Sequence, residues 1–187
     1  MTPCIWITGL SASGKSTFAQ ALKEKLDKQS VSSYILDGDE LRKGLCSDLS
    51  LTPEDRSENI RRMAHVAKIV SNTGTIPICA IISPYINDRE NARKLFEESN
   101  FIEIYLSTKI EVCAARDPKG LYMKAKQGKI KGMTGIDAPY EAPINPELTF
   151  DTAIEELDEM VNQLLEVLLR KKQLSTNTNA GALNHIL

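Results

Sequence analysis

The sequence predicts an α/β fold in which a mostly parallel sheet carries helices on both faces. Short apolar runs alternate with segments of helical periodicity, and this alternation is typical of parallel sheets with helical crossovers. The first run leads through a glycine-rich loop, GLSASGKS, directly into an amphipathic segment. The 187 residues, 42% of them apolar and 26% charged, suit one domain of ordinary globular composition.

Four short apolar runs are predicted to be buried strands, because strands covered on both faces show continuous rather than alternating hydrophobicity. They lie at Cys4–Thr8, Ser33–Leu36, Ile76–Ile82 and Phe101–Leu106. The first predicted helix follows the glycine-rich loop. Its apolar residues recur every four positions, at Phe18, Leu22 and Leu26.

Two further helices are predicted from their start signals. One opens at TPED, where Thr52 suits the N-cap, Pro53 the first helical position and Asp55 the acid of a capping box. The other opens at NDRE, with Asn87 as the cap and Glu90 three residues later.

A last helix is predicted from about Thr152, with an apolar stripe at Ile154, Leu157, Val161, Leu164 and Leu168. Beyond Leu174 the sequence is polar and without pattern, so we expect a disordered tail. We therefore predict one domain over residues 1–174, a tail over 175–187, and a lid at about 116–145.

Composition and charge exclude several classes of function. The formal net charge of −2 argues against a protein that binds DNA or RNA duplexes. No apolar stretch reaches the length of a transmembrane helix, and MTPCIWITGL lacks the basic region of a signal peptide. The four cysteines have no metal-like spacing, so we expect reduced thiols. We expect a cytoplasmic protein that binds neither nucleic acid nor a membrane.

The glycine-rich loop fits the phosphate-binding pattern G-x-x-x-x-G-K-S. Glycines let backbone N–H groups turn toward phosphate oxygens, and the helix that follows favours negative charge. Lys15 can reach the β- and γ-phosphates, and the Ser16 hydroxyl suits Mg²⁺. The sequence therefore predicts a nucleoside triphosphate site formed by Gly9, Ser11, Ala12, Ser13, Gly14, Lys15, Ser16 and Thr17.

Two aspartates in LDGDELR follow the second strand, where the carboxyl ends of parallel strands face the ligand crevice. Asp37 and Asp39 can position Mg²⁺ and accept a proton from an attacking hydroxyl. Alternatively, one of them caps the helix that begins near Glu40. We predict a catalytic role for Asp39, and Asp37 remains open between a functional and a capping role.

Basic residues occupy two further segments. Arg56 and Asn59 share a face in DRSENIRR, and an arginine in the first turn of a helix is favourable when it meets an anion. The turn ISPY, residues 82–85, ends the third strand at the crevice. Residues 116–141 carry six basic and three acidic side chains, which suits a lid that closes over phosphates and excludes water.

Together these motifs resemble adenylyl-sulfate (APS) kinase. The resemblance rests on GLSASGKST, DGDELR, PEDRSENIRR, ISPY and RDPKGLYMKA…GKIKGMTGIDAPYE, in register from about Ile5 to Thr152. It implies a P-loop kinase-type three-layer sandwich, usually dimeric. Such an enzyme moves the γ-phosphate of MgATP onto the ribose 3′-hydroxyl of adenosine 5′-phosphosulfate and yields PAPS, the sulfate donor.

The resemblance also implies roles for individual residues. Asp39, Lys15 and Lys119 would be catalytic, Ser16 and Asp39 would organise Mg²⁺, and Arg116 would lie on the ATP side. The acceptor nucleotide would be held by Asp37, Arg42, Leu51, Arg56, Asn59, Ile82, Ser83, Lys119, Gly120, Leu121, Met133 and Thr134.

Two positions depart from the family's pattern. The family has phenylalanines in Gly-Phe-Ser and Lys-Gly-Phe-Thr-Gly that sandwich the acceptor base, whereas this chain has Leu51 and Met133. Stacking of a base on an aromatic ring contributes about 1–3 kcal/mol, so these substitutions weaken the part of the site that reads the base.

Three hypotheses follow from this departure. The first is an APS kinase with a weakened base clamp. The second keeps the 3′-phosphorylation but changes the nucleotide, for example to cytidine diphosphoramidate of capsule modification. The third is a P-loop NTPase or regulatory domain without kinase activity, against which the intact Lys15, Ser16 and Asp39 argue.

Overall fold

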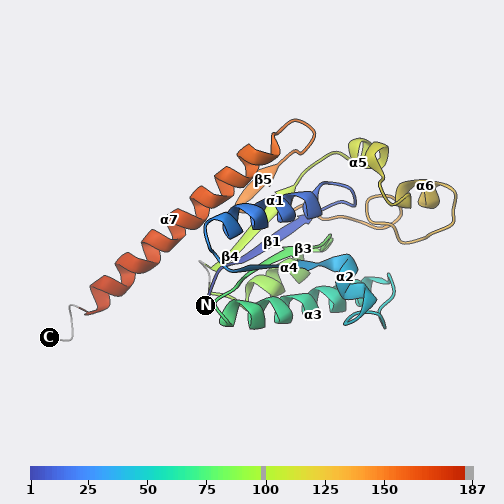
Figure 1. Ribbon diagram of the computed structural model, residues 1–187. Coiled ribbons are helices and arrows are strands. Elements are labelled where there is room, and N and C mark those ends of the chain that lie inside the picture. The colour runs from blue at the N-terminus through green and yellow to red at the C-terminus, as the bar shows by residue number, and fades with distance from the viewer. Residues whose placement is uncertain (98–99, 184–187) are drawn as a thin grey trace.

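The computed structural model describes residues 1–97 and 100–183, and it shows one parallel sheet between two layers of helices (Figure 1). The sheet order is β2-β3-β1-β4-β5, and every neighbouring pair is parallel. The strands are β1 (Cys4–Gly9), β2 (Ser33–Asp37), β3 (Ile76–Ala80), β4 (Phe101–Leu106) and β5 (Leu148–Phe150). The predicted α/β class is confirmed, and β5 is an addition that the sequence did not predict.

The helices cover both faces of this sheet. Within the described residues they are α1 (Lys15–Lys28), α2 (Gly38–Lys43), α3 (Pro53–Asn72), α4 (Ile86–Arg93), α5 (Ile110–Arg116), α6 (Leu121–Lys126) and α7 (Leu157–Leu183). Helices α1 and α7 pack on one face, and α3 and α4 pack on the other (Figure 1).

Strand β1 shows how one sequence run serves both layers. Every residue of β1 is buried, and successive side chains point to opposite faces of the sheet. Ile5 and Ile7 join the core with Phe18 of α1, whereas Trp6 joins the core with Met63 of α3. A central strand covered on both faces has no polar face, so it appears in the sequence as a continuous apolar run.

Helix α3 begins as predicted, and α4 does not. The Thr52 side chain accepts the N–H of Asp55, with Pro53 at the first helical position. Helix α4 begins at Ile86 with Tyr85 as its N-cap, so the prediction of Asn87 as the cap was wrong. The Glu141 carboxylate, distant in sequence, accepts the Ile86 N–H at 2.7 Å and satisfies this helix end instead.

Helix α7 begins later and extends further than predicted. A turn over residues 151–156, in which the Asp151 N–H donates to the Glu155 carboxylate at 2.6 Å, precedes the helix, and Ile154 is 81% exposed rather than part of the apolar stripe. The helix continues past residue 174, the predicted start of the tail, as far as Leu183, because extending an existing helix costs far less than nucleating one. Residues 184–187 of the predicted tail lie outside the described residues. Within the described part of the chain, no helix combines the length and apolarity needed to span a membrane.

Candidate active site

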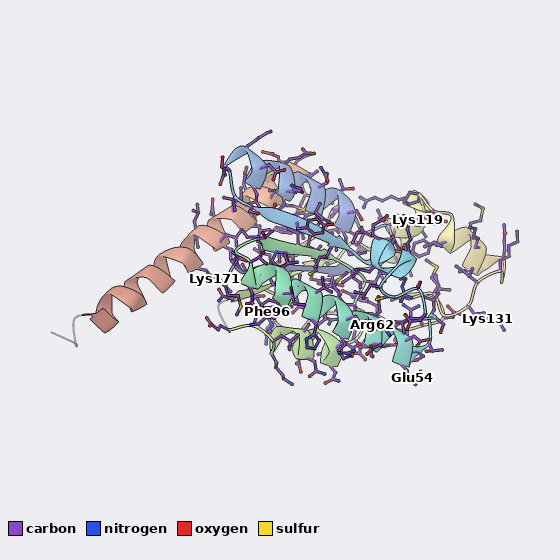
Figure 2. The ribbon with its side chains drawn as sticks, turned by 60° about the horizontal axis from the view of Figure 1, so that its bottom comes forward. Glu54, Arg62, Phe96, Lys119, Lys131 and Lys171 are labelled. Atoms are coloured by element: carbon purple, nitrogen blue, oxygen red, sulfur yellow. The ribbon has the colours of Figure 1, made fainter. Side chains whose placement is uncertain are left out.

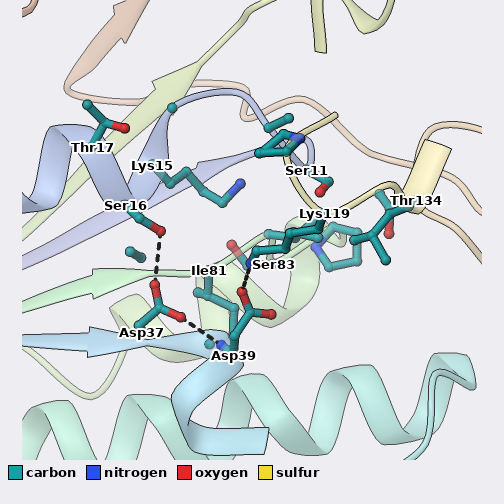
Figure 3. Close-up of a pocket in the computed structure, with 18 of the residues that line it drawn as sticks. Ser11, Lys15, Ser16, Thr17, Asp37, Asp39, Ile81, Ser83, Lys119 and Thr134 are labelled. Carbon is teal, nitrogen blue, oxygen red and sulfur yellow. Dashed lines mark hydrogen bonds and ion pairs between the residues drawn. The ribbon is translucent and has the colours of Figure 1, made fainter. Parts of the chain in front are cut away.

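A cavity of about 650 Å³ lies among the glycine-rich loop, α2, α3, the ISPY turn and the lid (Figure 3). Figure 2 shows Lys119 and Lys131 of the lid together at one end of the molecule. The predicted site residues that line the cavity are Ser11, Ala12, Gly14, Lys15, Ser16, Thr17, Asp37, Asp39, Arg42, Leu51, Arg56, Asn59, Ile82, Ser83, Arg116, Lys119, Leu121, Met133 and Thr134. Three others, Gly9, Ser13 and Gly120, are not among the lining residues.

The glycine-rich loop needs glycine at its first position for steric reasons. Gly9 has φ +147°, and a Cβ there would lie 2.7 Å from the carbonyl oxygen of Leu106 on β4. Ala12 and Gly14 also have positive φ, at 60° and 99°. Successive turns of this kind direct backbone N–H groups toward one point, which is the geometry of an anion site.

The Lys15 side chain curls back over this loop. Its Nζ donates to the carbonyl oxygens of Gly9 at 3.0 Å and Leu10 at 2.6 Å. Burial lowers the pKa of Lys15 to about 8. Because the unfolded chain binds this proton more tightly, stability is expected to rise with pH between about 8 and the ordinary lysine value of 10.5.

Proton uptake on ATP binding follows from the lowered pKa of Lys15. At pH 8.5, above this lowered pKa, part of the free protein lacks the proton, and a bound triphosphate favours the charged ammonium. Calorimetric titration with MgATP in buffers of different ionisation enthalpy should show net uptake at pH 8.5. The uptake should be lost in Lys15→Ala measured at saturating nucleotide, and persistence in that variant contradicts the assignment.

The two aspartates have different partners. Asp37 caps α2 by accepting the N–H of Asp39 at 2.8 Å, and it also accepts the Ser16 hydroxyl at 3.0 Å (Figure 3). Asp37 therefore caps α2 and also contacts Ser16, the predicted Mg²⁺ ligand. Asp39 forms an ion pair with Lys119, so a carboxylate of α2 meets the lid across the cavity.

The oxygen ligands at this point fit Mg²⁺. Within residues 1–97 and 100–183, no three His, Cys, Asp or Glu side chains gather as a complete metal cage. Magnesium uses few protein ligands and keeps waters and substrate phosphates around it. The Ser16 hydroxyl and the carboxylates of Asp37 and Asp39 supply such a partial set.

The Arg56 guanidinium joins α3 to the lid. It is 7% exposed, and it donates to the Leu51 carbonyl at 3.0 Å, to the Thr134 hydroxyl at 2.9 Å and to the Gly132 carbonyl. Burial lowers its pKa from the ordinary arginine value. Here the guanidinium holds the lid backbone beside the cavity, and its predicted contact with an anion stays a prediction.

Asn59 carries an unpaired acceptor in the cavity wall. The residue is 3% exposed, and its Oδ1 has no hydrogen-bond partner among the described residues. An unsatisfied buried polar atom costs about 1–3 kcal/mol, and a ligand hydroxyl or N–H would remove this cost. Arg42, nearby, donates to the Ser50 carbonyl at 3.0 Å and holds the segment that precedes α3.

The two positions that depart from the family pattern differ in burial. Leu51 is 46% exposed at the cavity rim. Met133 is 7% exposed, lines the same cavity, and packs in a small apolar cluster with Cys113 and Tyr122. Met133 therefore contacts the cavity on one side and the interior of the lid region on the other.

Sequence reasoning missed Thr152 as a site residue. Its hydroxyl donates to the Ser13 carbonyl at 2.9 Å, and Arg116 donates to the same hydroxyl at 2.7 Å and to the Thr152 carbonyl at 2.8 Å. Thr152 thus fixes Arg116 against the glycine-rich loop. The only local signal was a threonine near a predicted helix start, which gave no indication of this contact.

Comparisons with known proteins agree with this geometry. The family model described as Adenylylsulphate kinase matches residues 1–151. A protein of Prochlorococcus marinus named Adenylyl-sulfate kinase is 49% identical over 165 residues, which cover 88% of this chain and 82% of that protein. Another of this name, from Clostridium acetobutylicum, is 51% identical over 90% of this chain and 84% of its own.

A solved structure shares the fold. The APS kinase of Mycobacterium tuberculosis in complex with AMPPNP and APS is 41% identical, with a TM-score of 0.86 over 89% of this chain and 97% of its own. The three-layer arrangement of helices around a parallel sheet is therefore that of APS kinase structures.

Proposed function

This chain belongs to the adenylyl-sulfate kinase family and is a phosphotransferase, and from this premise we propose that it transfers the γ-phosphate of MgATP to the ribose 3′-hydroxyl of adenosine 5′-phosphosulfate. The observation that carries the proposal is the single cavity in which Lys15, Ser16, Asp39 and Lys119 lie with the predicted acceptor residues. Phosphoryl transfer requires this combination of phosphate binding, a proton acceptor and a closing lid.

The phosphate end of the site follows from the glycine-rich loop. Its backbone N–H groups and the start of α1 bind the phosphates, and Lys15 leaves its two carbonyl partners to neutralise charge on the transferring group. Ser16 and Asp39 would hold Mg²⁺, which would supply further charge neutralisation. Arg116, fixed by Thr152, lies on the ATP side of the cavity.

The acceptor end follows from α2, α3 and the lid. Asp39 accepts the proton of the 3′-hydroxyl, and Lys119 exchanges its contact with Asp39 for phosphate oxygens when nucleotides bind. The Asn59 Oδ1 accepts a hydroxyl or N–H of the acceptor. Arg56 fixes the lid segment that carries Met133 and Thr134 and presents positive charge toward the phosphosulfate.

The two sequence relatives reported above bear on which nucleotide is the acceptor. Each of the two sequence relatives is named for the adenylyl-sulfate reaction, so they do not favour a cytidine nucleotide as the acceptor. We further propose a cytoplasmic homodimer. The family resemblance supports the dimer, and the net charge of −2 agrees with a small-molecule rather than a nucleic-acid partner.

A coupled assay tests the proposed reaction. ADP release should rise at least about a hundredfold when adenosine 5′-phosphosulfate is added to enzyme and MgATP, because phosphoryl transfer to water is excluded by the lid. Chromatography should show one PAPS formed per ADP. Equal ADP release with and without the acceptor, or release without PAPS, contradicts the proposal.

Restoring the aromatic base clamp should improve use of the acceptor. Leu51→Phe adds a ring at an exposed position of the cavity rim, and stacking of about 1 kcal/mol lowers KM for adenosine 5′-phosphosulfate about fivefold. KM for ATP should stay unchanged, which is the internal control. An unaltered acceptor KM places residue 51 away from the base. Met133→Phe is a less direct probe, because residue 133 also packs against Cys113 and Tyr122.

A further inference from the structure

Behind the ISPY turn lies a buried polar cluster that the proposed mechanism does not use. Arg89 of α4 is 2% exposed and pairs with Glu103 of β4 at 2.8 Å. From its contacts we propose that Arg89 is a positioning residue, which holds the acceptor-binding turn and the C-terminal end of the lid in one fixed arrangement. The kinetic part of this proposal rests on the proposed function.

The three donor groups of the Arg89 guanidinium bind three different segments. Nε donates to the Glu103 carboxylate at 2.8 Å. One terminal nitrogen donates to the Ser83 carbonyl of the turn at 2.6 Å, and the other donates to the Glu141 carbonyl of the lid at 2.7 Å. A planar guanidinium presents these donors in a rigid fork, which a lysine ammonium cannot reproduce.

The end of the lid is bonded to the same turn by its own backbone. The Glu141 N–H donates to the Pro84 carbonyl at 2.8 Å, and the Glu141 carboxylate accepts the Ile86 N–H at 2.7 Å. One residue earlier, the Tyr140 hydroxyl lies 2.9 Å from the Thr8 hydroxyl of β1. The lid therefore has a fixed end at residues 140–141, and Arg89 lies directly behind it.

The turn itself adopts a backbone conformation that requires support. Ser83 has φ +40°, in the left-handed region that residues other than glycine rarely adopt. Such strain persists only where surrounding contacts hold it. Those contacts include the Arg89 donation to the Ser83 carbonyl and the Trp6 indole N–H, which donates to the Ser83 hydroxyl at 3.1 Å. The Thr8 hydroxyl adds a donation to the Ile82 carbonyl at 2.6 Å and a longer one to the Ser83 carbonyl at 3.4 Å.

The position of this cluster predicts a selective kinetic effect. Ile82 and Ser83 line the cavity on the acceptor side, whereas the ATP side is formed by the glycine-rich loop and Arg116. Loosening the turn should raise KM for the acceptor, and loosening the end of the lid should lower kcat and admit water. KM for ATP should change little.

Two lysine substitutions on one helix form the test. Arg89→Lys keeps the charge beside Glu103 but loses the fork that reaches the turn and the lid. Arg93→Lys is the control, because Arg93 pairs with the same Glu103 at 3.1 Å. Its other partners are Glu147 at 2.7 Å and the Phe101 carbonyl at 3.4 Å. Among the described residues Arg93 makes no hydrogen bond to the turn or the lid. It is 28% exposed, so its replacement is milder for packing.

In Arg89→Lys we expect KM for adenosine 5′-phosphosulfate to rise about tenfold, with more ADP released per PAPS formed. In Arg93→Lys the acceptor KM and the amount of ADP released per PAPS should both stay within about twofold of the values for the unmodified enzyme. Equal acceptor KM values in the two variants, or a matching rise in KM for ATP in Arg89→Lys, overturn the proposal.

Hydrogen exchange measured by mass spectrometry gives a readout independent of activity. Peptides containing the Ile86 and Glu141 amides should exchange faster in Arg89→Lys and not in Arg93→Lys, while α1 exchanges at the unmodified rate in both. Faster exchange throughout the chain would mean a purely structural role and overturns the proposal. If the unmodified enzyme forms no PAPS, the proposed function fails, and the exchange comparison still decides the role of Arg89.

Discussion

Replacing Lys15 by alanine is expected to lower kcat for phosphoryl transfer by about 10³-fold, because the charge that develops on the transferring group loses one of the cations that would neutralise it. The folding stability of the protein should not decrease. Burial lowers the pKa of Lys15, and removing the ammonium relieves this desolvation, so we expect the melting temperature of Lys15→Ala at pH 7 to be no lower than that of the unmodified enzyme. Steady-state kinetics and thermal unfolding measure the two effects.

A matched lysine on the same helix serves as the control for Lys15. Lys23 of α1 pairs with Asp27 on the surface at 2.7 Å and lies outside the cavity lining. Lys23→Ala should keep kcat within about twofold, because exposed i,i+4 pairs contribute only a few tenths of a kcal/mol. A similar loss of activity in both variants would show that removal of positive charge from α1, rather than the position of Lys15, causes the effect.

Replacing Asp39 by asparagine is expected to lower kcat by about 10²- to 10⁴-fold, the usual contribution of a general base. The Asp39 side chain is 61% exposed and that of its partner Lys119 is 56% exposed, so stability should change little. The loss should appear mainly in kcat, and the Mg²⁺ concentration for half-maximal activity should rise as well, because Asp39 is also a proposed Mg²⁺ ligand. A variant that retains full kcat assigns proton acceptance to another group.

Asp37→Asn separates the two roles that the sequence left open for Asp37. Asparagine caps helices about as well as aspartate, so the α2 cap and the stability of the protein should remain. If the contact with Ser16 helps to hold Mg²⁺, the variant should require about tenfold more Mg²⁺ for half-maximal activity. An unchanged Mg²⁺ requirement assigns Asp37 to helix capping alone.

An element could be predicted from the sequence when the residues that determine it lie close together in the chain. The strand Phe101–Leu106 was predicted with its observed bounds, because a strand buried on both faces is mostly apolar, and Glu103 is the one charged residue in this run. Strand β5 was missed because three residues, Leu148–Phe150, carry no periodicity. Spacing alone places Ile154 in the helical stripe. In the structure Ile154 is exposed, because a turn in which the Asp151 N–H donates to the Glu155 carboxylate precedes the helix.

The same distinction applies to the site. The glycine-rich loop was predictable because its eight residues act together, and spacing alone identifies it. The contacts of Arg89 and Thr152 depend on residues far along the chain, Glu141 and Ser13 respectively. No local pattern contains such pairings, so they became visible only when the fold brought the segments together.

The burial of Met133 has a consequence for redesign of this enzyme. The Met133 side chain lines the cavity and also packs in the cluster with Cys113 and Tyr122, so a substitution there changes both sets of contacts. A larger residue at this position overfills the cluster, and a smaller one leaves a void beneath the lid. Libraries aimed at a new acceptor should therefore vary residue 133 together with residues 113 and 122, whereas Leu51, exposed at the rim, can be varied alone.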